Sequence, residues 1–410
     1  MRRASFIVPA CFIGLAVSVS PAYLSVFGLF IKPMADDLGM SRTELSSIPS
    51  MTALVSAILS PFVGALIDRW GSRSLAFIGA VLLPLGLLAH SLIGGSYSFI
   101  LALSLFMGLA SASACPLPYI SILPQWFSRN LGLAISLGMA GIGFGQIVLP
   151  RVAAYLITMG GWRSAWGTMA AIVAVVGLLN AIFLLRDNPE FRARKDASRR
   201  EGDAAAVTGA TLTQAVRTPG FWLLAGSVFL VAQVGVGVMI HIVPLLTDRG
   251  ITTVAASNAI AVMGVGSLIG RLSTGIALDR LNIAPVGGVL FSLQALGILA
   301  LWSEMGGIVP YLAVFLIGVA VGAETDIIPF TIRAKFGLRQ FGKIFGLAFG
   351  IFSLGPVVGP LVMGRFFDTF ASYSFVLLLF SAASLLAAAF IMIVAAMDVK
   401  VEGSSEERRT

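Results

Sequence analysis

Charged residues are scarce in this chain, and their scarcity excludes most soluble proteins. Asp, Glu, Lys and Arg make up 11% of the 410 residues, while 58% are hydrophobic; soluble domains carry roughly 25% charged residues. A surface this poor in charge requires lipid as its solvent. The net charge is +8, and the Lys and Arg residues lie in short segments between apolar runs. This distribution is typical of residues that set the orientation of a membrane protein, and it forms no basic face for nucleic acid.

Cysteine and histidine are also rare, which excludes several kinds of site. Cys11 and Cys115 lie inside apolar runs, where packing is their ordinary role and no disulfide framework is indicated. His90 and His241 lie on separate spans, so no metal site is predicted. The sequence has neither a phosphate-binding loop nor a Ser-His-Asp set. We therefore expect no cofactor, no ATP-driven pumping within this chain and no enzyme.

Apolar runs of about 20 residues, the length of a membrane-spanning helix, recur twelve times. They cover residues 6–31, 46–67, 74–94, 98–123, 131–158, 165–185, 221–246, 255–278, 286–304, 308–331, 341–364 and 371–397. The first resembles a signal peptide, but it continues to Ile31 and is too long for the apolar part of a typical signal. We therefore expect an uncleaved first helix.

A hydrophilic stretch at 186–220 divides the spans into two sets of six. It lacks apolar periodicity and is too short and polar for a separate domain. The sequence predicts an all-α membrane protein, with an N-terminal bundle at 1–185 and a C-terminal bundle at 221–397. The hydrophilic stretch becomes a cytoplasmic linker, and residues 398–410 become a cytoplasmic tail.

The distribution of basic residues predicts the orientation. With the N-terminus in the cytoplasm, 20 of the 27 Lys and Arg residues fall on the cytoplasmic side and five on the outer side, as the positive-inside rule requires. An even number of spans places both termini in the cytoplasm. The lack of an Asn-x-Ser/Thr acceptor fits a bacterial inner membrane. We expect the protein to function as a monomer.

Two charged turns repeat 211 residues apart, each after the second span of its set. They are Gly64-Ala-Leu-Ile-Asp68-Arg69-Trp-Gly71-Ser-Arg73 and Gly275-Ile-Ala-Leu-Asp279-Arg280. The same offset relates Asp37 to Asp248. Two parallel halves related by an axis along the membrane normal are a known transporter architecture.

The first turn and the twelve-span layout resemble the major facilitator superfamily, in which this motif joins helices two and three. The resemblance covers the whole chain and implies secondary transport by alternating access around a midplane site. It implies gating roles for Asp68, Arg69 and Arg73, and in the shorter copy for Asp279 and Arg280. These charges are expected to pair with the other half and stabilise an outward-open state; solvated, orientation-setting charges are the alternative.

Three further segments resemble the monocarboxylate and oxalate/formate transporter branch of that superfamily. They are residues 30–42, 241–250 and 323–337. The branch implies a small organic monocarboxylate as the substrate, moved with a proton. An exporter of drug-like or amphipathic compounds and a dicarboxylate or anion exchanger remain alternatives. The Gly-Pro motif of such exporters is poorly matched at 141–150.

Arg271 is the main candidate for substrate binding. It lies about 12 Å along its helix from Asp279, where a membrane-embedded Arg costs about 2.5–3.5 kcal/mol and is normally paired or facing water. The branch resemblance implies that it binds a carboxylate, which the guanidinium fork suits. The alternative is a structural ion pair with Glu324 or Asp326. Ser267 stands where animal monocarboxylate transporters have an acid four residues before this arginine.

Glu324 and Asp326 are the proton-coupling candidates. Residues two apart on a helix point in different directions, so we expect one to line the cavity and the other to face a neighbouring helix. Burial favours a neutral carboxyl, whereas a nearby Arg favours the charged form. That competition would couple proton binding to substrate binding.

Uncharged candidates for the substrate site come from several spans. They are Tyr23, Ser25, Tyr119 and Gln146, and packing inside the bundle is the alternative for the two tyrosines. His241, near the outer end of span seven, has either a gate or substrate role or an interfacial one. Arg151 either snorkels to the interface or adds a second cation that would favour dicarboxylates. The branch's lysines within helices one and eleven have no counterpart here, which favours a monoanion.

Overall fold

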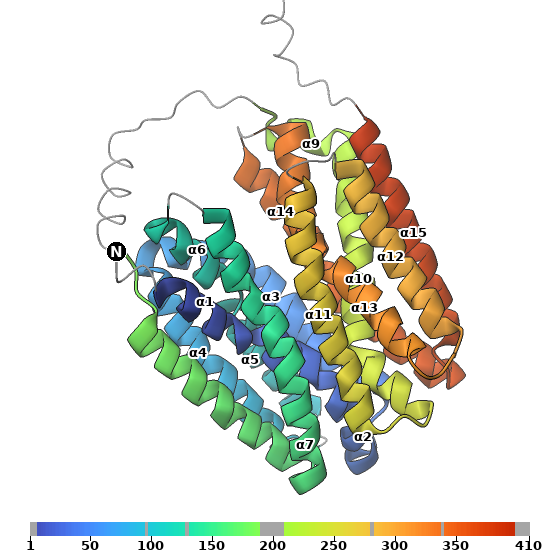
Figure 1. Ribbon diagram of the computed structural model, residues 1–410. Helices are drawn as coiled ribbons and strands as arrows, with labels where there is room; N and C mark the ends of the chain where they lie inside the picture. The colour runs from blue at the N-terminus through green and yellow to red at the C-terminus, as the bar shows by residue number, and fades with distance from the viewer. Residues whose placement is uncertain are drawn as a thin grey trace, which may run out of the picture.

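The computed structural model describes residues 6–94, 97–127, 131–188, 209–278, 283–337 and 340–397. Within these ranges the chain is helical between its turns, apart from one isolated backbone bridge between Gly209 and Gly337. Figure 1 shows the helices gathered into two sets that lie side by side. The fold class expected from the sequence is therefore confirmed.

The first half contains six crossings. The first crossing is made of α1 (Ile7–Ala16), the π-helix η2 (Ser20–Leu24) and α2 (Ser25–Leu38). The second is α3 (Arg42–Trp70) and the third is α4 (Ser72–His90). The fourth combines α5 (Tyr97–Ser113) and α6 (Leu117–Trp126). The long α7 (Leu131–Leu179) and η3 (Asn180–Leu184) supply the fifth and sixth crossings. The fifth and sixth crossings meet at Gly161 within α7, whose φ of +75° lies in the left-handed region that favours glycine.

The second half repeats this order. The short α9 (Leu212–Val216) precedes α10 (Pro219–Asp248), α11 (Thr253–Leu278), α12 (Ile283–Trp302), α13 (Val309–Phe336), α14 (Phe341–Phe370) and α15 (Ser374–Ala396). α11 begins 211 residues after α3, and α12 begins 211 residues after α4. The offset seen in the charged turns therefore extends to whole helices.

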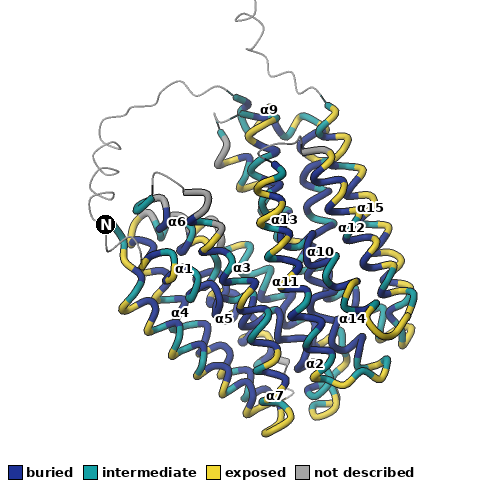
Figure 2. The backbone as a smooth tube through the Cα atoms, viewed as in Figure 1, coloured by how far each residue is buried: buried dark blue, intermediate teal, exposed yellow. Residues whose placement is uncertain are grey.

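Ten helices in the described ranges are long and apolar enough to cross a bilayer. One of them, Leu137–Leu184, covers most of the fifth and sixth predicted spans, and α3 covers the second. Each predicted span thus coincides with a helical segment. α15 exposes Leu378, Leu385 and Met392 at seven-residue intervals, which is one lipid-facing stripe. Figure 2 shows such exposed positions on the outer faces of the helices and buried ones between them.

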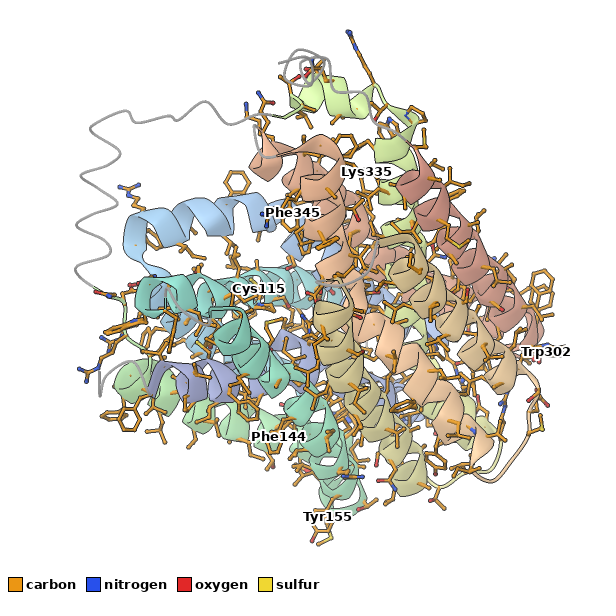
Figure 3. The ribbon with its side chains drawn as sticks, turned by 45° about the horizontal axis from the view of Figure 1, so that its top comes forward. Cys115, Phe144, Tyr155, Trp302, Lys335 and Phe345 are labelled. Atoms are coloured by element: carbon orange, nitrogen blue, oxygen red, sulfur yellow. The ribbon has the colours of Figure 1, made fainter. Side chains whose placement is uncertain are left out.

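The two ends of the molecule differ. We call the end that carries α9 the linker end, and the end with the turns α2–α3 and α10–α11 the far end. Figure 1 shows the two halves closest at the far end and separating toward the linker end. In Figure 3, Lys335 marks the linker end, while Tyr155 and Trp302 mark the far end.

The packing of α11 on α13 positions the membrane-embedded charges. A Cβ added at Gly322 would overlap the backbone carbonyl of Ser267, and one at Gly270 would overlap that of Val319. Helices in lipid approach this closely only where small residues meet. The contact brings Arg271 of α11 beside the acidic segment of α13.

Candidate functional site

Arg271 and Asp326 form an ion pair inside the second half. Nη1 of Arg271 lies 3.4 Å from Oδ1 of Asp326. The side chains are 16% and 36% exposed, so the pair retains access to its surroundings. The pairing that the sequence offered as the alternative role of Arg271 is present in this structure. The Arg271 guanidinium can bind another carboxylate in place of Asp326, because the same hydrogen bonds form with either one.

The face of α11 that carries Arg271 is turned toward the first half. Two residues of α11 on this face, Gly264 and Leu268, contact Gly143 of α7. Arg271 follows Gly264 by seven residues, about two turns, and so shares its face. Gly275, one turn further toward the linker end, has open space where a side chain would be. The ion pair therefore lies where the two halves begin to part.

Glu324 points elsewhere, as expected for a residue two positions from Asp326. It is 4% exposed, and its Oε2 has no hydrogen-bond partner in the described part of the chain. Gly235 of α10 and Gln294 of α12 are its neighbours: Oε2 lies 3.8 Å and the Gln294 amide nitrogen 3.5 Å from the Cβ position of Gly235. Glu324 thus faces the interior of the second half.

His241 lies in a different place, at the joint between the halves. Its Nε2 is 3.0 Å from Ser46 Oγ and 3.1 Å from the Pro360 carbonyl oxygen. Because that oxygen only accepts, Nε2 carries the hydrogen, and Nδ1 accepts the Tyr373 hydroxyl at 3.0 Å. The fully buried ring connects helices of both halves. This geometry favours the gate role over contact with a substrate at Arg271.

An ionic cluster surrounds that joint at the far end. Arg42 of α3 approaches Asp248 of α10 at 2.6 Å and donates to the Tyr373 hydroxyl at 2.6 Å. Its guanidinium lies 3.5 Å from the centroid of the Phe367 ring, a cation–π contact. Lys32 donates to the same Asp248 carboxylate at 3.2 Å. We call this group the far-end cluster, with these members: Lys32, Arg42, Thr43, Ser46, His241, Asp248, Phe367, Asp368 and Tyr373.

Sequence reasoning did not identify most of the far-end cluster. The sequence indicated no contact between them: Asp248 belongs to the segment 241–250 and is the repeat partner of Asp37, and Arg42 belongs to the segment 30–42. The matching charges near the ends of spans one and seven were the available signal. Arg151, for which the interface and the cavity are the two alternatives, is exposed and donates from Nε to Asn258 Oδ1 of α11 at 2.9 Å. It therefore also joins the halves.

All four uncharged candidates belong to the first half, and three of them lie away from its contact with the second half near Arg271. Tyr23 is fully buried, with ring centroids 5.2 Å from His90 and 6.3 Å from Trp166. Ser25 donates to the Pro21 carbonyl oxygen at 2.7 Å. Tyr119 is 5% exposed and lies beside Gly14. The structure does not bring these side chains together with Arg271.

Gln146 is the uncharged candidate that lies at the contact between the halves. Its amide nitrogen is 3.3 Å from Ser20 Oγ and 4.0 Å from the sulfur of Met239 in α10. Its Cβ lies 3.0 Å from the Cβ position of Gly264, which is on the face of α11 that carries Arg271. Gln146 is therefore about two turns from the ion pair on the far-end side.

The predicted gating charges are described only in part. Arg73 donates to the carbonyl oxygens of Ala181 and Ile182 at 3.2 and 2.8 Å, so it caps the last crossing of its own half. Arg69 is exposed at the end of α3. The side chain of Asp68, and both Asp279 and Arg280, lie outside the described residues. Across the described ranges, His, Cys, Asp and Glu form no group of three or more that could hold a metal ion.

Two repeated six-helix halves with a partly exposed ion pair where they part define a class of protein: integral membrane proteins of the transporter type. A family model described as the Major Facilitator Superfamily matches residues 12–360. The chain belongs to this superfamily, whose members are transporters.

The comparisons with individual proteins support this assignment. The chain is 29% identical to the MFS-type transporter pytF of Aspergillus terreus over 273 residues, covering 65% of this chain and 87% of that protein. It is 26% identical to mouse monocarboxylate transporter 11 over 378 residues, covering 87% and 80%. A crystal structure of a D-xylose–proton symporter matches with a TM-score of 0.72 at 16% identity, covering 97% and 98%; at this identity the match shows the fold alone.

Proposed function

We propose that the protein carries a small organic monocarboxylate together with a proton, and that Arg271 binds the carboxylate. The observation that supports this most is the Arg271–Asp326 pair, 3.4 Å apart, partly exposed and on a face turned toward the other half. The likeness to monocarboxylate transporter 11 over most of both chains favours the same substrate class.

The pair suggests how substrate and proton are coupled. A substrate carboxylate that binds Arg271 displaces Asp326 from the guanidinium. A partly buried carboxylate that loses its cationic partner favours its neutral form more than before, so Asp326 takes up a proton as the substrate binds. Glu324, buried against α10 and α12, is the second candidate for that proton. Release of the substrate returns Asp326 to Arg271 and expels the proton.

We further propose that the linker end is cytoplasmic, in a bacterial inner membrane, with both termini on that side. The closed far end then faces outward, and the structure corresponds to an inward-facing state. The halves at 1–185 and 221–397 rock about the site, with Asp68, Arg69, Asp279 and Arg280 pairing in the opposite state. Because Arg151 is engaged by Asn258, Arg271 acts as a central cation without it, which suits a monoanion. We also propose that the transporter functions as a monomer.

Uptake into proteoliposomes with an inside-alkaline pH gradient tests the proposal. Labelled lactate, pyruvate, oxalate and benzoate form the panel, and accumulation that collapses with a protonophore is expected. Arg271→Ala should lower the uptake rate about 100-fold, because it removes two charge-assisted hydrogen bonds. Arg271→Lys is the matched control: it keeps the charge without the fork, so it should retain part of the activity.

Other outcomes would redirect the assignment. Oxalate movement that needs counter-loaded anion and ignores the protonophore would indicate an anion exchanger. Failure of every acid to accumulate, with or without counter-loaded substrate, would reject the carboxylate proposal and leave export of amphipathic compounds to be tested. Full activity of Arg271→Ala would reject the site.

A further inference from the structure

Two antiparallel helices from different halves meet most closely at the far end. They are α3, which begins there at Arg42, and α14, which ends there at Phe370. A Cβ at Gly364 of α14 would lie 3.0 Å from the Arg42 carbonyl oxygen and 3.1 Å from Ser46 Oγ. The last turns of α14 therefore contact the first turn of α3.

The first turn of α3 has four backbone N–H groups without partners inside the helix. Its own capping box uses two of them: Ser41 N–H donates to Glu44 Oε2 at 2.8 Å, and Glu44 N–H donates to Ser41 Oγ at 3.2 Å. The remaining two donate to Asp368 of the other half. Arg42 N–H lies 3.2 Å from Oδ1 and Thr43 N–H lies 2.8 Å from Oδ2.

Asp368 therefore completes the cap of a helix in the opposite half, and it also accepts the hydroxyl of Thr43. A carboxylate at a helix N-terminus is stabilised by the helix dipole as well as by the hydrogen bonds. The donors are backbone groups, so they cannot swing to follow a retreating partner as the side chains of Lys32 and Arg42 can. This contact exists only while the two helix ends are in register.

We propose that Asp368 is the gating residue of the far end, whose carboxylate latches the first half to the second through the N-terminus of α3. Opening of the far end requires its release. Loss of the carboxylate should therefore shift the ratio of far-end-closed to far-end-open molecules about ten-fold toward open. The prediction is independent of which substrate is transported.

Distances between pairs of spin labels in nanodisc-embedded protein test this proposal. After Cys11 and Cys115 are replaced by alanine, one pair is attached at Met159 and Met305, exposed at the far ends of the two halves. The other pair is attached at Ser74 and Thr213, exposed at the linker end. Asp368→Ala should populate a longer far-end distance and a shorter linker-end distance. Asp368→Asn, which keeps an acceptor and loses the charge, should shift both populations less.

Asp37→Ala is the matched control. Asp37 is also a far-end carboxylate, but its partners Trp162 and Arg163 belong to its own half. It should leave both distance distributions unchanged. The proposal is overturned if the Asp368 variants reproduce the wild-type distributions at both pairs, or if Asp37→Ala shifts them as much. If Asp368→Ala fails to fold, the Asn variant alone decides between these outcomes.

Discussion

The two halves share the same order of helices and differ in the side chains that those helices carry. The 211-residue offset pairs Arg271 with Ser60, Glu324 with Ser113 and Asp326 with Cys115. The second half therefore carries charge in the membrane where the first carries small neutral side chains. The first half instead has a buried group of rings, in which Trp166 stacks on Phe30 at 3.9 Å and lies 4.9 Å from His90.

This difference teaches how a duplicated fold can separate its tasks. Under the proposed alternating access, both halves need the same helix order, because contacts that alternate between two ends require matched surfaces. In the proposed function, the second half supplies the charges that bind the substrate, and the rings of the first half stabilise its fold. We expect substitutions in the buried rings of the first half to change stability, and substitutions at the membrane-embedded charges of the second half to change transport.

The largest effect should come from exchanging the two members of the ion pair. Arg271→Asp combined with Asp326→Arg preserves an opposite-charge pair between α11 and α13. If the pair were only structural, the exchange would restore function. We expect the double variant to recover thermal stability relative to Arg271→Asp alone, yet to transport at least about 100-fold more slowly than wild type, since the cation is displaced from its substrate-facing position.

Thermal unfolding and proteoliposome uptake of the same preparations separate the two results. Cys115→Ser, at the position that corresponds to Asp326 in the first half, is the control and should transport like wild type. Near-normal uptake by the exchanged pair would contradict the binding role of Arg271.

A smaller effect on transport, but a large one on stability, is expected at Trp166. Its side chain is fully buried, so Trp166→Ala should lower the free energy of unfolding by about 3–5 kcal/mol. Trp166→Phe keeps most of the ring and should cost less. Denaturant unfolding in detergent measures the first quantity, and substrate affinity measured below the unfolding range should stay unchanged in both variants. Weakened binding without lost stability would break the distinction between the halves.

The helix order and the internal repeat could be predicted from the sequence because both are encoded by local patterns of residues. Each span is a run of apolar residues, and the repeat is readable from Gly64–Arg73 and its copy. The Arg271–Asp326 pair could be offered as an alternative for a similar reason. A membrane-embedded cation needs a partner, and Glu324 and Asp326 are acids in the membrane spans of the same half.

The far-end cluster and the direction of Tyr23 could not be predicted in this way. Arg42 and Asp368 are 326 residues apart, and no local pattern encodes a backbone cap supplied by another half. Tyr23 lies in the π-helix η2, where the change from the usual helical period rotates the following side chains. The sequence left open whether Tyr23 lines the substrate path or packs against other rings, and the structure places it beside His90 and Trp166.

The smallest effect should come from Lys32, and it sharpens the contrast between side-chain and backbone contacts at the far end. Its ion pair with Asp248 involves a side chain that is 44% exposed, so Lys32→Ala should shift the far-end equilibrium less than about five-fold. That shift should disappear in about 1 M salt, which screens exposed charges beyond about 3 Å. Arg42→Ala, which also loses Tyr373 and Phe367, should shift the spin-label distances more and should respond less to salt. Equal shifts in the two variants would mean that net charge, rather than the buried contacts of Arg42, holds the far end closed.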